Sequence, residues 1–232
     1  MTQTLAIIPA YNEEGSIKAT IDELKRTAPH IASIVINDGS QDATQKILQE
    51  HKIPHLTLPC NLGLAGAFQA GMKYAFKHGY DYAIQIDGDG QHDPAYIQDL
   101  INTIEAEDAD IVIGSRFIDQ KKPLSLRMLG SAFITLMMRI TTGRRITDPT
   151  SGMRIYSRRM IEAFAHNPEL IPEPDTMALL IKEGAKVSEV PVRMRERTAG
   201  RSYLNVTSAL GYMLRVGVSI LFIQPFMKKG SL

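Results

Sequence analysis

Short apolar runs alternate with amphipathic segments along the first half of the chain. The apolar runs have the length of buried strands, and the segments between them carry apolar residues at the i, i+3, i+4 spacing of helices. The predicted strands are 4–9, 31–37, 55–58, 82–86 and 110–114, and the predicted helices between them are 16–28, 42–51, 61–78 and 94–107. This alternation predicts an α/β fold with right-handed crossovers and a mainly parallel central sheet.

The pattern changes after Asp119. Residues 126–140 are strongly apolar, but they fall short of the roughly 20 apolar residues that a membrane-spanning helix needs. Their apolar side chains run round the predicted helix instead of along one stripe, which favours a helix in a bilayer interface over a core helix. A second short apolar segment, 216–223, precedes a basic tail that suits an anionic leaflet. The other predicted elements are a turn and strand at 147–156, helices at 158–165 and 175–183, and a strand at 186–194.

Composition narrows the class of protein. The 232 residues include 26 Lys and Arg against 25 Asp and Glu, so bulk charge does not point to a nucleic-acid partner, and none is predicted. The single cysteine, Cys60, excludes an internal disulfide and fits a reducing compartment. The first residues have no basic segment and lead directly into a predicted strand, so we expect no signal peptide.

Two carboxylates and an amide follow the predicted strand 82–86 within one turn. They are Asp87, Asp89 and Gln91, and Gly88 and Gly90 between them leave room for a sharp bend and a bulky ligand. Hard divalent cations prefer oxygen ligands, and Mg²⁺ is usually held by one or two carboxylates together with substrate phosphates. The stretch therefore indicates a metal site, with a solvated Asp/Gly turn as the alternative.

Polar residues also follow two other predicted strands, at 11–14 and 37–40. In open α/β sheets ligands bind at the carboxyl ends of the strands. We therefore expect both loops to face the same crevice as the metal loop.

Seven motifs in this order resemble glycosyltransferase family 2 enzymes of GT-A fold, and among them the polyprenyl-phosphate glycosyltransferases related to dolichol-phosphate mannose synthase. The motifs are IIPAYNEEGSI, VINDGSQDAT, NLGLAGAFQAG, IQIDGDGQHDP, GSR, DPTSGMRIYS and EVPVRMRERTAGRSYL. They cover nearly the whole chain. The resemblance implies a GT-A domain at 1–202 with a Rossmann-like nucleotide-binding half. An amphipathic insertion at 118–145 would face the acceptor or the membrane, and an apolar C-terminal helix at 203–232 would contact a membrane or a partner.

The resemblance also implies roles for matching positions on the donor side. Asp87, Asp89 and Gln91 would bind Mg²⁺ or Mn²⁺ bridging the donor diphosphate. The residues implied to hold the nucleotide are Pro9, Tyr11, Glu13, Asp38 and Asp87.

Arginines are implied at both substrates. Arg201, with Ser202, would close over the diphosphate, because a guanidinium fork suits phosphate oxygens. Arg116 and Arg127 would hold the lipid phosphate. The alternative for each arginine is a solvated surface charge.

Asp175 remains open between two roles. It would be a general base if the acceptor were a sugar hydroxyl, which must lose a proton. It would instead position the donor sugar, the role we favour, if the acceptor were a phosphate. Two other residues, Asp148 and Arg154, either line the acceptor side or brace the fold, and His92 supports the metal loop rather than binding the ion.

The expected reaction is a metal-dependent, inverting transfer from UDP-N-acetylglucosamine or UDP-glucose to undecaprenyl phosphate, for cell-envelope polysaccharide synthesis. Expected partners are the membrane surface, a small membrane protein and further copies of the chain. The expected location is the cytoplasmic face of the cell membrane. The alternatives are a glycosyltransferase acting on a hydroxyl and a non-catalytic nucleotide-sugar-binding subunit of a membrane complex.

Overall fold

The computed structural model describes residues 2–120, 126–195, 211 and 215–223. Its centre is a seven-stranded sheet with the order β3-β2-β1-β4-β6-β5-β7. The strands are β1 (Thr4–Ala10), β2 (Ala32–Asn37), β3 (His55–Thr57), β4 (Tyr82–Gln85), β5 (Ile111–Ser115), β6 (Arg154–Ser157) and β7 (Val187–Pro191). Every neighbouring pair is parallel except the two pairs that β6 makes with β4 and β5. The predicted α/β fold with a mainly parallel sheet is confirmed.

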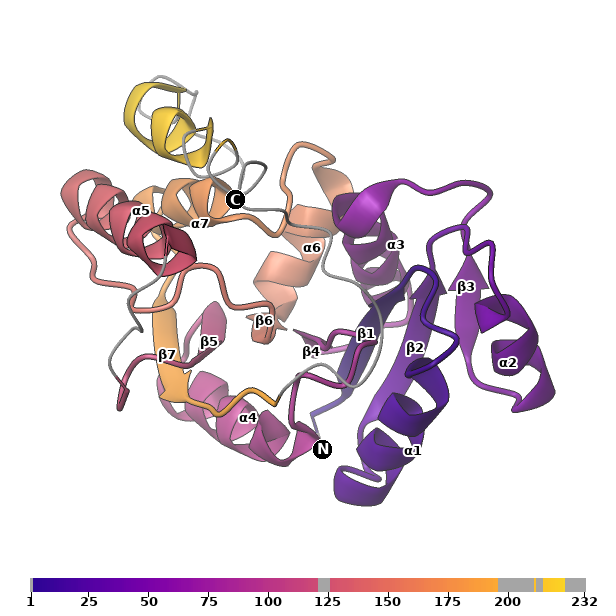
Figure 1. Ribbon diagram of the computed structural model, residues 1–232. Helices are drawn as coiled ribbons and strands as arrows, with labels where there is room; N and C mark the ends of the chain where they lie inside the picture. The colour runs from indigo at the N-terminus through magenta and orange to yellow at the C-terminus, as the bar shows by residue number, and fades with distance from the viewer. Residues whose placement is uncertain (1, 121–125, 196–210, 212–214, 224–232) are drawn as a thin grey trace.

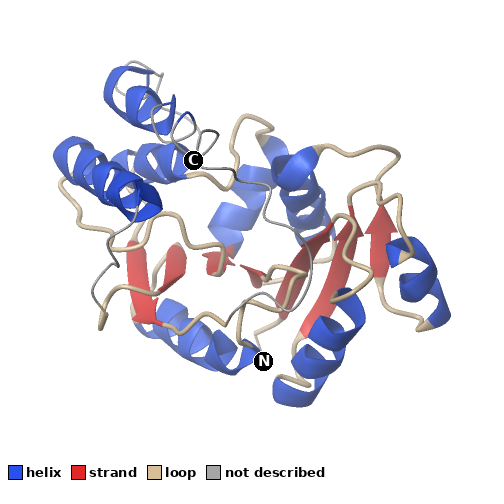
Figure 2. Ribbon diagram, in the orientation of Figure 1, coloured by secondary structure: helices blue, strands red, loops and turns tan. Residues whose placement is uncertain are grey.

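Helices cover both faces of this sheet (Figures 1 and 2). The helices are α1 (Ile17–Thr27), α2 (Thr44–Glu50), α3 (Gly63–Lys77), α4 (Ile97–Ala106), α5 (Leu126–Thr142), α6 (Arg158–His166) and α7 (Pro174–Lys182), with a short 3₁₀ helix η1 (Pro94–Tyr96) and a short π-helix η2 (Ser219–Ile223). One core cluster joins the sheet to α1, α2 and α4, and the other joins it to α3, α5, α6 and α7.

Strand β1 shows how the sequence builds the two cores. Leu5 and Ile7 are buried in the cluster under α3, whereas Ala6 and Ile8 are buried in the cluster over α1. Successive side chains of a strand point to opposite faces, so a run of apolar residues is required where both faces are covered. A Cβ at Gly71 of α3 would lie 2.3 Å from Ile7 Cγ2, so α3 packs closely on β1 at this position.

Most element boundaries differ by one or two residues from the sequence prediction. The predicted helix 94–107 is divided into η1 and α4, because the Asp93 side chain caps the first turn by accepting from Ala95 N–H. The predicted strand 186–194 ends at Pro191, and the predicted strand 31–37 begins at Ala32.

Helix α5 has apolar side chains on two different faces. Ile134, Met137 and Met138 are buried, and the helix packs against α7 and η2. Its exposed large apolar residues recur at the spacing i, i+4, i+7, i+11 and are called the α5 stripe below. The α5 stripe consists of Leu129, Phe133, Leu136 and Ile140, which are 60%, 39%, 51% and 63% exposed. The sequence pattern favoured an interfacial helix over a core helix, but one face of α5 packs in the core and only the other reaches the surface.

The described part of the C-terminal segment packs beside α5. Val216 and Ile220 are buried in the same core cluster as α5 and α7. A Cβ at Gly217 would lie 2.4 Å from Phe133 Cε1, so the two segments approach closely. The predicted boundary between residues 202 and 203 lies outside the described residues. Within the described ranges, no helix combines the length and apolarity needed to cross a bilayer.

Candidate active site

The loops after β1 and β2 are joined at the carboxyl edge of the sheet. Asn12 N–H donates to Ser40 Oγ at 3.0 Å, and Gln41 N–H donates to Asn12 Oδ1 at 2.8 Å. Glu13 N–H donates to Thr44 Oγ1 at 2.9 Å, at the start of α2. These bonds hold the two loops side by side, as the sequence predicts.

The metal loop, residues 87–91, packs directly against the end of β1. A Cβ at Gly88 would lie 3.2 Å from the Pro9 carbonyl oxygen. Thr20 Oγ1 of α1 donates to the Gly88 carbonyl at 3.1 Å. The structure therefore brings the two predicted nucleotide loops and the metal loop into one place.

Asp87 and Asp89 are held in different ways. Asp89 is only 4% exposed, and its Oδ1 accepts from Gln91 N–H at 3.0 Å. The Asp87 side chain is 35% exposed, and its Oδ1 lies 3.4 Å from Gln85 Nε2. A Cβ at Gly152 would lie 3.1 Å from Asp87 Oδ2, so the loop after Asp148 passes close over this carboxylate.

The donor set of the metal loop fits a hard divalent cation. Two carboxylates and the amide oxygen of Gln91 are oxygen ligands, and a partly exposed Asp87 leaves one side open. Among the described residues, no group of three or more His, Cys, Asp or Glu side chains could hold a metal ion by itself. Two carboxylates alone are the usual protein contribution to Mg²⁺ when substrate phosphates complete the coordination shell. Asp87, Asp89 and Gln91 therefore fit an ion that binds together with a diphosphate.

His92 supports the metal loop from behind. It is 3% exposed, and its Nδ1 accepts from Asp87 N–H at 3.0 Å. Because Nδ1 accepts, a neutral ring carries its proton on Nε2, which lies 3.6 Å from Asp87 Oδ2. This position matches the predicted supporting role.

We expect His92→Ala to raise the Mn²⁺ concentration needed for half-maximal activity about 10- to 100-fold, because residues that orient metal ligands have effects of that size. A metal titration of the transfer rate measures this. His78→Ala is the matched control, since His78 is exposed and caps α3 at the opposite edge of the sheet. An unchanged metal titration for His92→Ala would contradict the supporting role.

Asp38 and Glu13 are fixed by bonds to the protein. Asp38 is 3% exposed, and its Oδ1 accepts from Leu62 N–H at 2.7 Å. Glu13 Oε2 accepts from Ser16 Oγ at 2.7 Å. Pro9 and Tyr11 are half-buried beside them. Their roles toward a nucleotide remain predictions.

Arg116 forms a bidentate ion pair with a buried carboxylate. Its Nε and Nη2 donate to Asp148 Oδ2 and Oδ1 at 2.6 and 2.7 Å, and Asp148 is fully buried. Glu189 of β7 fixes the same loop by accepting from Thr147 N–H at 2.8 Å and from Asp148 N–H at 3.0 Å. Asp148 therefore braces the fold, and only part of the Arg116 guanidinium is left for the predicted phosphate contact.

Arg154 joins the two loops above the sheet. It is 3% exposed, and its guanidinium donates to the carbonyls of Pro149 at 2.7 Å and Pro172 at 3.2 Å. Of the two roles left open for Arg154, the structure supports the bracing one.

Asp175 contacts the C-terminal segment. Its Oδ2 accepts from Ser219 Oγ at 2.8 Å, and its Oδ1 accepts from Thr176 N–H at 3.0 Å. Beside Asp175, the Arg215 guanidinium forms an ion pair with the Glu173 carboxylate at 3.4 Å. Burial raises the pKa of Glu173, the Asp175 carboxylate raises it further, and Arg215 opposes both.

Three predicted residues fall outside what the structure describes. The side chain of Arg127, at the start of α5, and both Arg201 and Ser202 are outside the described residues. Arg195, the last described residue before Arg201, contacts the metal loop, because its N–H donates to the Gln91 carbonyl at 3.0 Å.

Sequence reasoning missed Glu189, Ser219 and Arg195. Arg195 bridges Glu23 at 2.6 Å and Asp93 at 2.7 Å. Each of these contacts joins positions far apart along the chain, and no local pattern marks them.

Residues 5–164 match the family model described as glycosyl transferase family 2. The chain belongs to this family. Two curated relatives of this glycosyltransferase are each 30% identical to it. The first is the undecaprenyl-phosphate mannosyltransferase of Micrococcus luteus, with 88% of each chain aligned. The second is the UDP-N-acetylglucosamine–dolichyl-phosphate N-acetylglucosaminyltransferase of Methanococcus voltae, with 97% of this chain and 96% of the relative aligned.

A solved structure supports the GT-A fold of this glycosyltransferase. Glucosyl-3-phosphoglycerate synthase from Mycobacterium tuberculosis, in complex with Mn²⁺, UDP and phosphoglyceric acid, superposes with a TM-score of 0.70 at 18% identity. The superposition covers 98% of this chain and 80% of that one. The predicted family, fold and enzyme class are confirmed.

Proposed function

We propose that this glycosyltransferase moves a sugar from UDP-N-acetylglucosamine or UDP-glucose to undecaprenyl phosphate or another polyprenyl phosphate, with Mg²⁺ or Mn²⁺. The main support for binding of the nucleotide-sugar donor is the packing of the Asp87–Gln91 loop against the end of β1, beside Glu13 and Asp38. The acceptor half is supported by the names of the two relatives, each of which transfers a sugar to a polyprenyl-type phosphate.

Several residues of the chain bind the donor substrate in this proposal. Glu13 and Asp38 bind the nucleoside, since carboxylates accept from hydroxyl and imide groups. Asp87, Asp89 and Gln91 would hold the cation, which offsets the negative charge of the departing diphosphate when bound. Arg201 and Ser202, which lie outside the described residues, would bind the same diphosphate.

The acceptor needs no strong general base. A phosphate monoester has its second pKa at about 6, so near pH 7 it is mostly a dianion and already a nucleophile. One of its oxygens forms the bond to the anomeric carbon while the bond from that carbon to the donor phosphate oxygen breaks. In-line attack inverts the anomeric centre, and the nucleoside diphosphate leaves.

Asp175 separates this proposal from transfer to a sugar hydroxyl. Both of its carboxylate oxygens accept hydrogen bonds in the structure, which suits a fixed positioning residue. With a phosphate acceptor, Asp175→Asn is expected to keep the rate within about tenfold of wild type. As a general base for a hydroxyl, the same change would cost about 10²- to 10⁴-fold. Parallel assays with polyprenyl phosphate and with soluble glycoside acceptors distinguish the two reactions.

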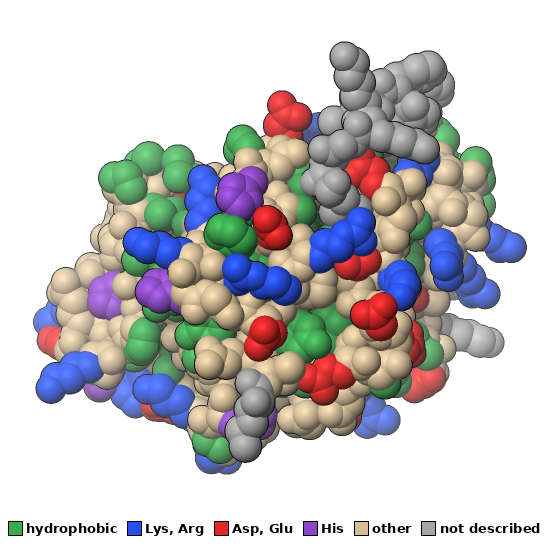
Figure 3. All heavy atoms as spheres, turned by 180° about the vertical axis from the view of Figure 1, so that it is seen from behind, with side chains coloured by type: hydrophobic (Ala, Val, Ile, Leu, Met, Phe, Trp, Pro, Cys, Tyr) green, Lys and Arg blue, Asp and Glu red, His purple; other side chains and the backbone are tan. Residues whose placement is uncertain are grey.

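The α5 stripe supports attachment to a membrane surface. In this proposal the surface is the inner face of the cell membrane, and a small membrane protein or a second copy of the chain is a further partner. Figure 3 shows basic and acidic side chains interspersed over the face opposite to that of Figure 1.

We expect the double change Leu136→Ser with Ile140→Ser to weaken binding to anionic vesicles at least about tenfold, because each buried Leu or Ile side chain contributes about 1.5–3 kcal/mol. Vesicle co-sedimentation measures this, and thermal unfolding should be unchanged because both side chains are exposed. Leu56→Ser is the control, as it alters an exposed leucine on β3 at the far edge of the sheet. Equal binding of all three proteins would contradict membrane attachment through α5.

A further inference from the structure

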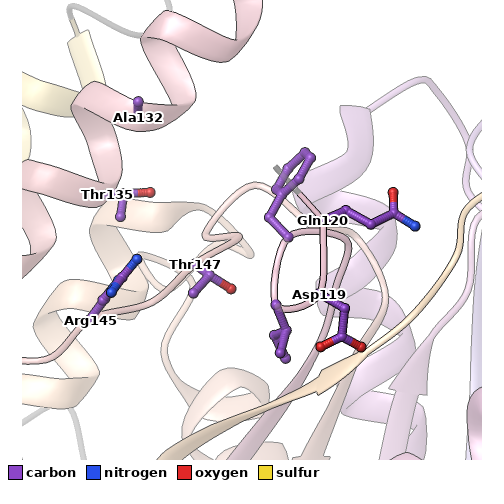
Figure 4. Close-up of a pocket in the computed structure, with 8 residues that line it drawn as sticks. Asp119, Gln120, Ala132, Thr135, Arg145 and Thr147 are labelled. Carbon is purple, nitrogen blue, oxygen red and sulfur yellow. The ribbon is translucent and has the colours of Figure 1, made fainter. Parts of the chain in front are cut away.

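A pocket of about 450 Å³ lies between α5, the loop after β5 and the segment that leads to Asp148. This segment continues to Gly152, where a Cβ would lie 3.1 Å from Asp87 Oδ2 of the metal loop. Figure 4 shows its lining, which is Phe117, Ile118, Asp119, Gln120, Ala132, Thr135, Arg145 and Thr147. We propose that this pocket binds the terminal phosphate of the lipid acceptor through Arg145, with the lipid chain leaving along the α5 stripe. This inference rests on the proposed function and names a residue beyond the predicted pair Arg116 and Arg127.

Among the described residues that line the pocket, Arg145 carries the positive charge. Its side chain is exposed, and the structure shows no hydrogen bond or ion pair to it from any described residue. Arg116, in contrast, directs two nitrogens at Asp148. An arginine is always charged near neutral pH, and its planar fork matches two phosphate oxygens. Of the two arginines, Arg145 therefore has its full guanidinium available for an anion.

Neither Asp119 nor Thr147 of the pocket is placed to bind the anion in place of Arg145. In Figure 4, Arg145 lies on the same side of the pocket as Thr135 and Ala132, whereas Asp119 lies on the opposite side and points away from it. Thr147 Oγ1 is already used, since it contacts Ser115 Oγ at 2.6 Å and donates to Glu189 at 2.9 Å.

The backbone on both sides of Arg145 is anchored. Gly143, with φ +71°, ends α5, and its N–H donates to the Arg139 carbonyl at 3.0 Å. On the other side Ile146 is buried, and Thr147 N–H bonds to Glu189. Arg145 is therefore presented from a segment that is fixed within two residues in each direction, which favours a defined phosphate position over a general surface charge.

The α5 stripe borders the pocket. Ala132 and Thr135 line the pocket, and the next residues along the helix, Phe133 and Leu136, belong to the stripe. Successive residues of an α-helix are turned by about 100°, so the two faces are adjacent. The exposed side chain of Ile118 adds apolar surface on the facing loop. A phosphate in the pocket thus has an apolar path for its isoprenoid chain directly beside it.

The test measures binding of radiolabelled farnesyl phosphate to the full chain by equilibrium dialysis without a bilayer, and KM for undecaprenyl phosphate in the transfer assay. Arg145→Gln is expected to weaken farnesyl phosphate binding and raise this KM about tenfold or more, the effect of losing one charge-assisted hydrogen bond. The KM for the nucleotide sugar should stay unchanged. Arg144→Gln, which removes the same charge one residue away on an exposed side chain, is the matched control and should change either value less than about threefold.

A second variant tests the pocket by shape. Ala132→Phe places a large side chain in the pocket from an exposed helix position and should weaken farnesyl phosphate binding as Arg145→Gln does. Leu56→Phe, an apolar exchange at an exposed position of β3 at the far edge of the sheet, is its control. Inorganic phosphate is the competitor that distinguishes a lipid phosphate from a free one, and we expect it to compete far more weakly than unlabelled farnesyl phosphate.

Equal effects of Arg145→Gln and Arg144→Gln, or equal competition by inorganic phosphate, would overturn the assignment. The outcomes also distinguish failure of the pocket assignment from failure of the proposed function. If the wild-type protein binds farnesyl phosphate through Arg145 but transfers no sugar, the pocket stands and the reaction is wrong. If it transfers sugar and Arg145→Gln keeps the wild-type KM for undecaprenyl phosphate, the reaction stands and the pocket is wrong.

Discussion

Asp89→Asn is expected to lower kcat of the transfer reaction by about 10²- to 10³-fold or more. The change keeps the size of a buried side chain but removes one of the two negative charges of the metal loop. Loss of a single preorganised electrostatic group at a reaction centre has effects of this size, and the loss of a metal ligand belongs to the same class. Initial rates at saturating donor, acceptor and Mn²⁺ measure the effect.

The control for Asp89→Asn is Asp99→Asn, which makes the same chemical change at an exposed position of α4. That variant should keep wild-type activity, and both should unfold at similar temperatures. An Asp89→Asn protein with more than a tenth of wild-type kcat would contradict the assignment of the metal loop.

Arg116→Gln is expected to lower the free energy of unfolding by about 3 kcal/mol. Asp148 is fully buried, and Arg116 supplies its charged partner through two nitrogens. Removing one member of a buried pair leaves the other charge uncompensated, which costs about 3–5 kcal/mol. For a chain of this size each kcal/mol corresponds to roughly 2–4 °C, so thermal unfolding should shift by about 6–12 °C.

A double-mutant cycle with Asp148→Asn isolates the Arg116–Asp148 pair. The double variant should lose less stability than the sum of the two single variants, because the uncompensated charge disappears. If Arg116→Gln unfolded like wild type and raised only KM for the lipid acceptor, the bracing role would be wrong. The predicted phosphate role of Arg116 would then be favoured.

The parallel half of the fold could be predicted because its signals are local. A buried parallel strand needs a continuous apolar run, and each covering helix needs one apolar stripe, so β1 to β4 and their helices are visible in the sequence. The meeting of the loops after β1, β2 and β4 followed from topology alone, since parallel strands end at the same edge.

The reversed strand β6 could not be predicted in the same way. Nothing in residues 154–157 marks their direction, and β6 pairs antiparallel with two strands that are distant in the chain. Long-range polar pairs were equally hidden. Arg116 and Asp148 are 32 residues apart, and Asp175 and Ser219 are 44 apart. Such pairs depend on how the elements pack, which periodicity does not encode.

Helix α5 shows a different limit of sequence reasoning. Its buried and exposed faces are both apolar, so the pattern could not say which residues reach the surface. The structure separates them because α7 and η2 cover one face, whereas Leu129, Leu136 and Ile140 of the α5 stripe stay more than half exposed. The pocket beside the stripe needs the loop after β5 and the segment before β6 to be placed together, and no motif in either segment indicates that.

The most direct test of the central claim is a transfer assay with purified protein, undecaprenyl phosphate in detergent and Mn²⁺ or Mg²⁺. Radiolabelled UDP-N-acetylglucosamine, UDP-glucose and GDP-mannose are supplied in parallel, and label is counted in the organic phase. We expect label from one of the two UDP-sugars and its loss on adding EDTA. Organic-phase label from GDP-mannose alone would contradict the proposed donor. No lipid label from any donor, with transfer to a soluble glycoside instead, would contradict the proposed acceptor.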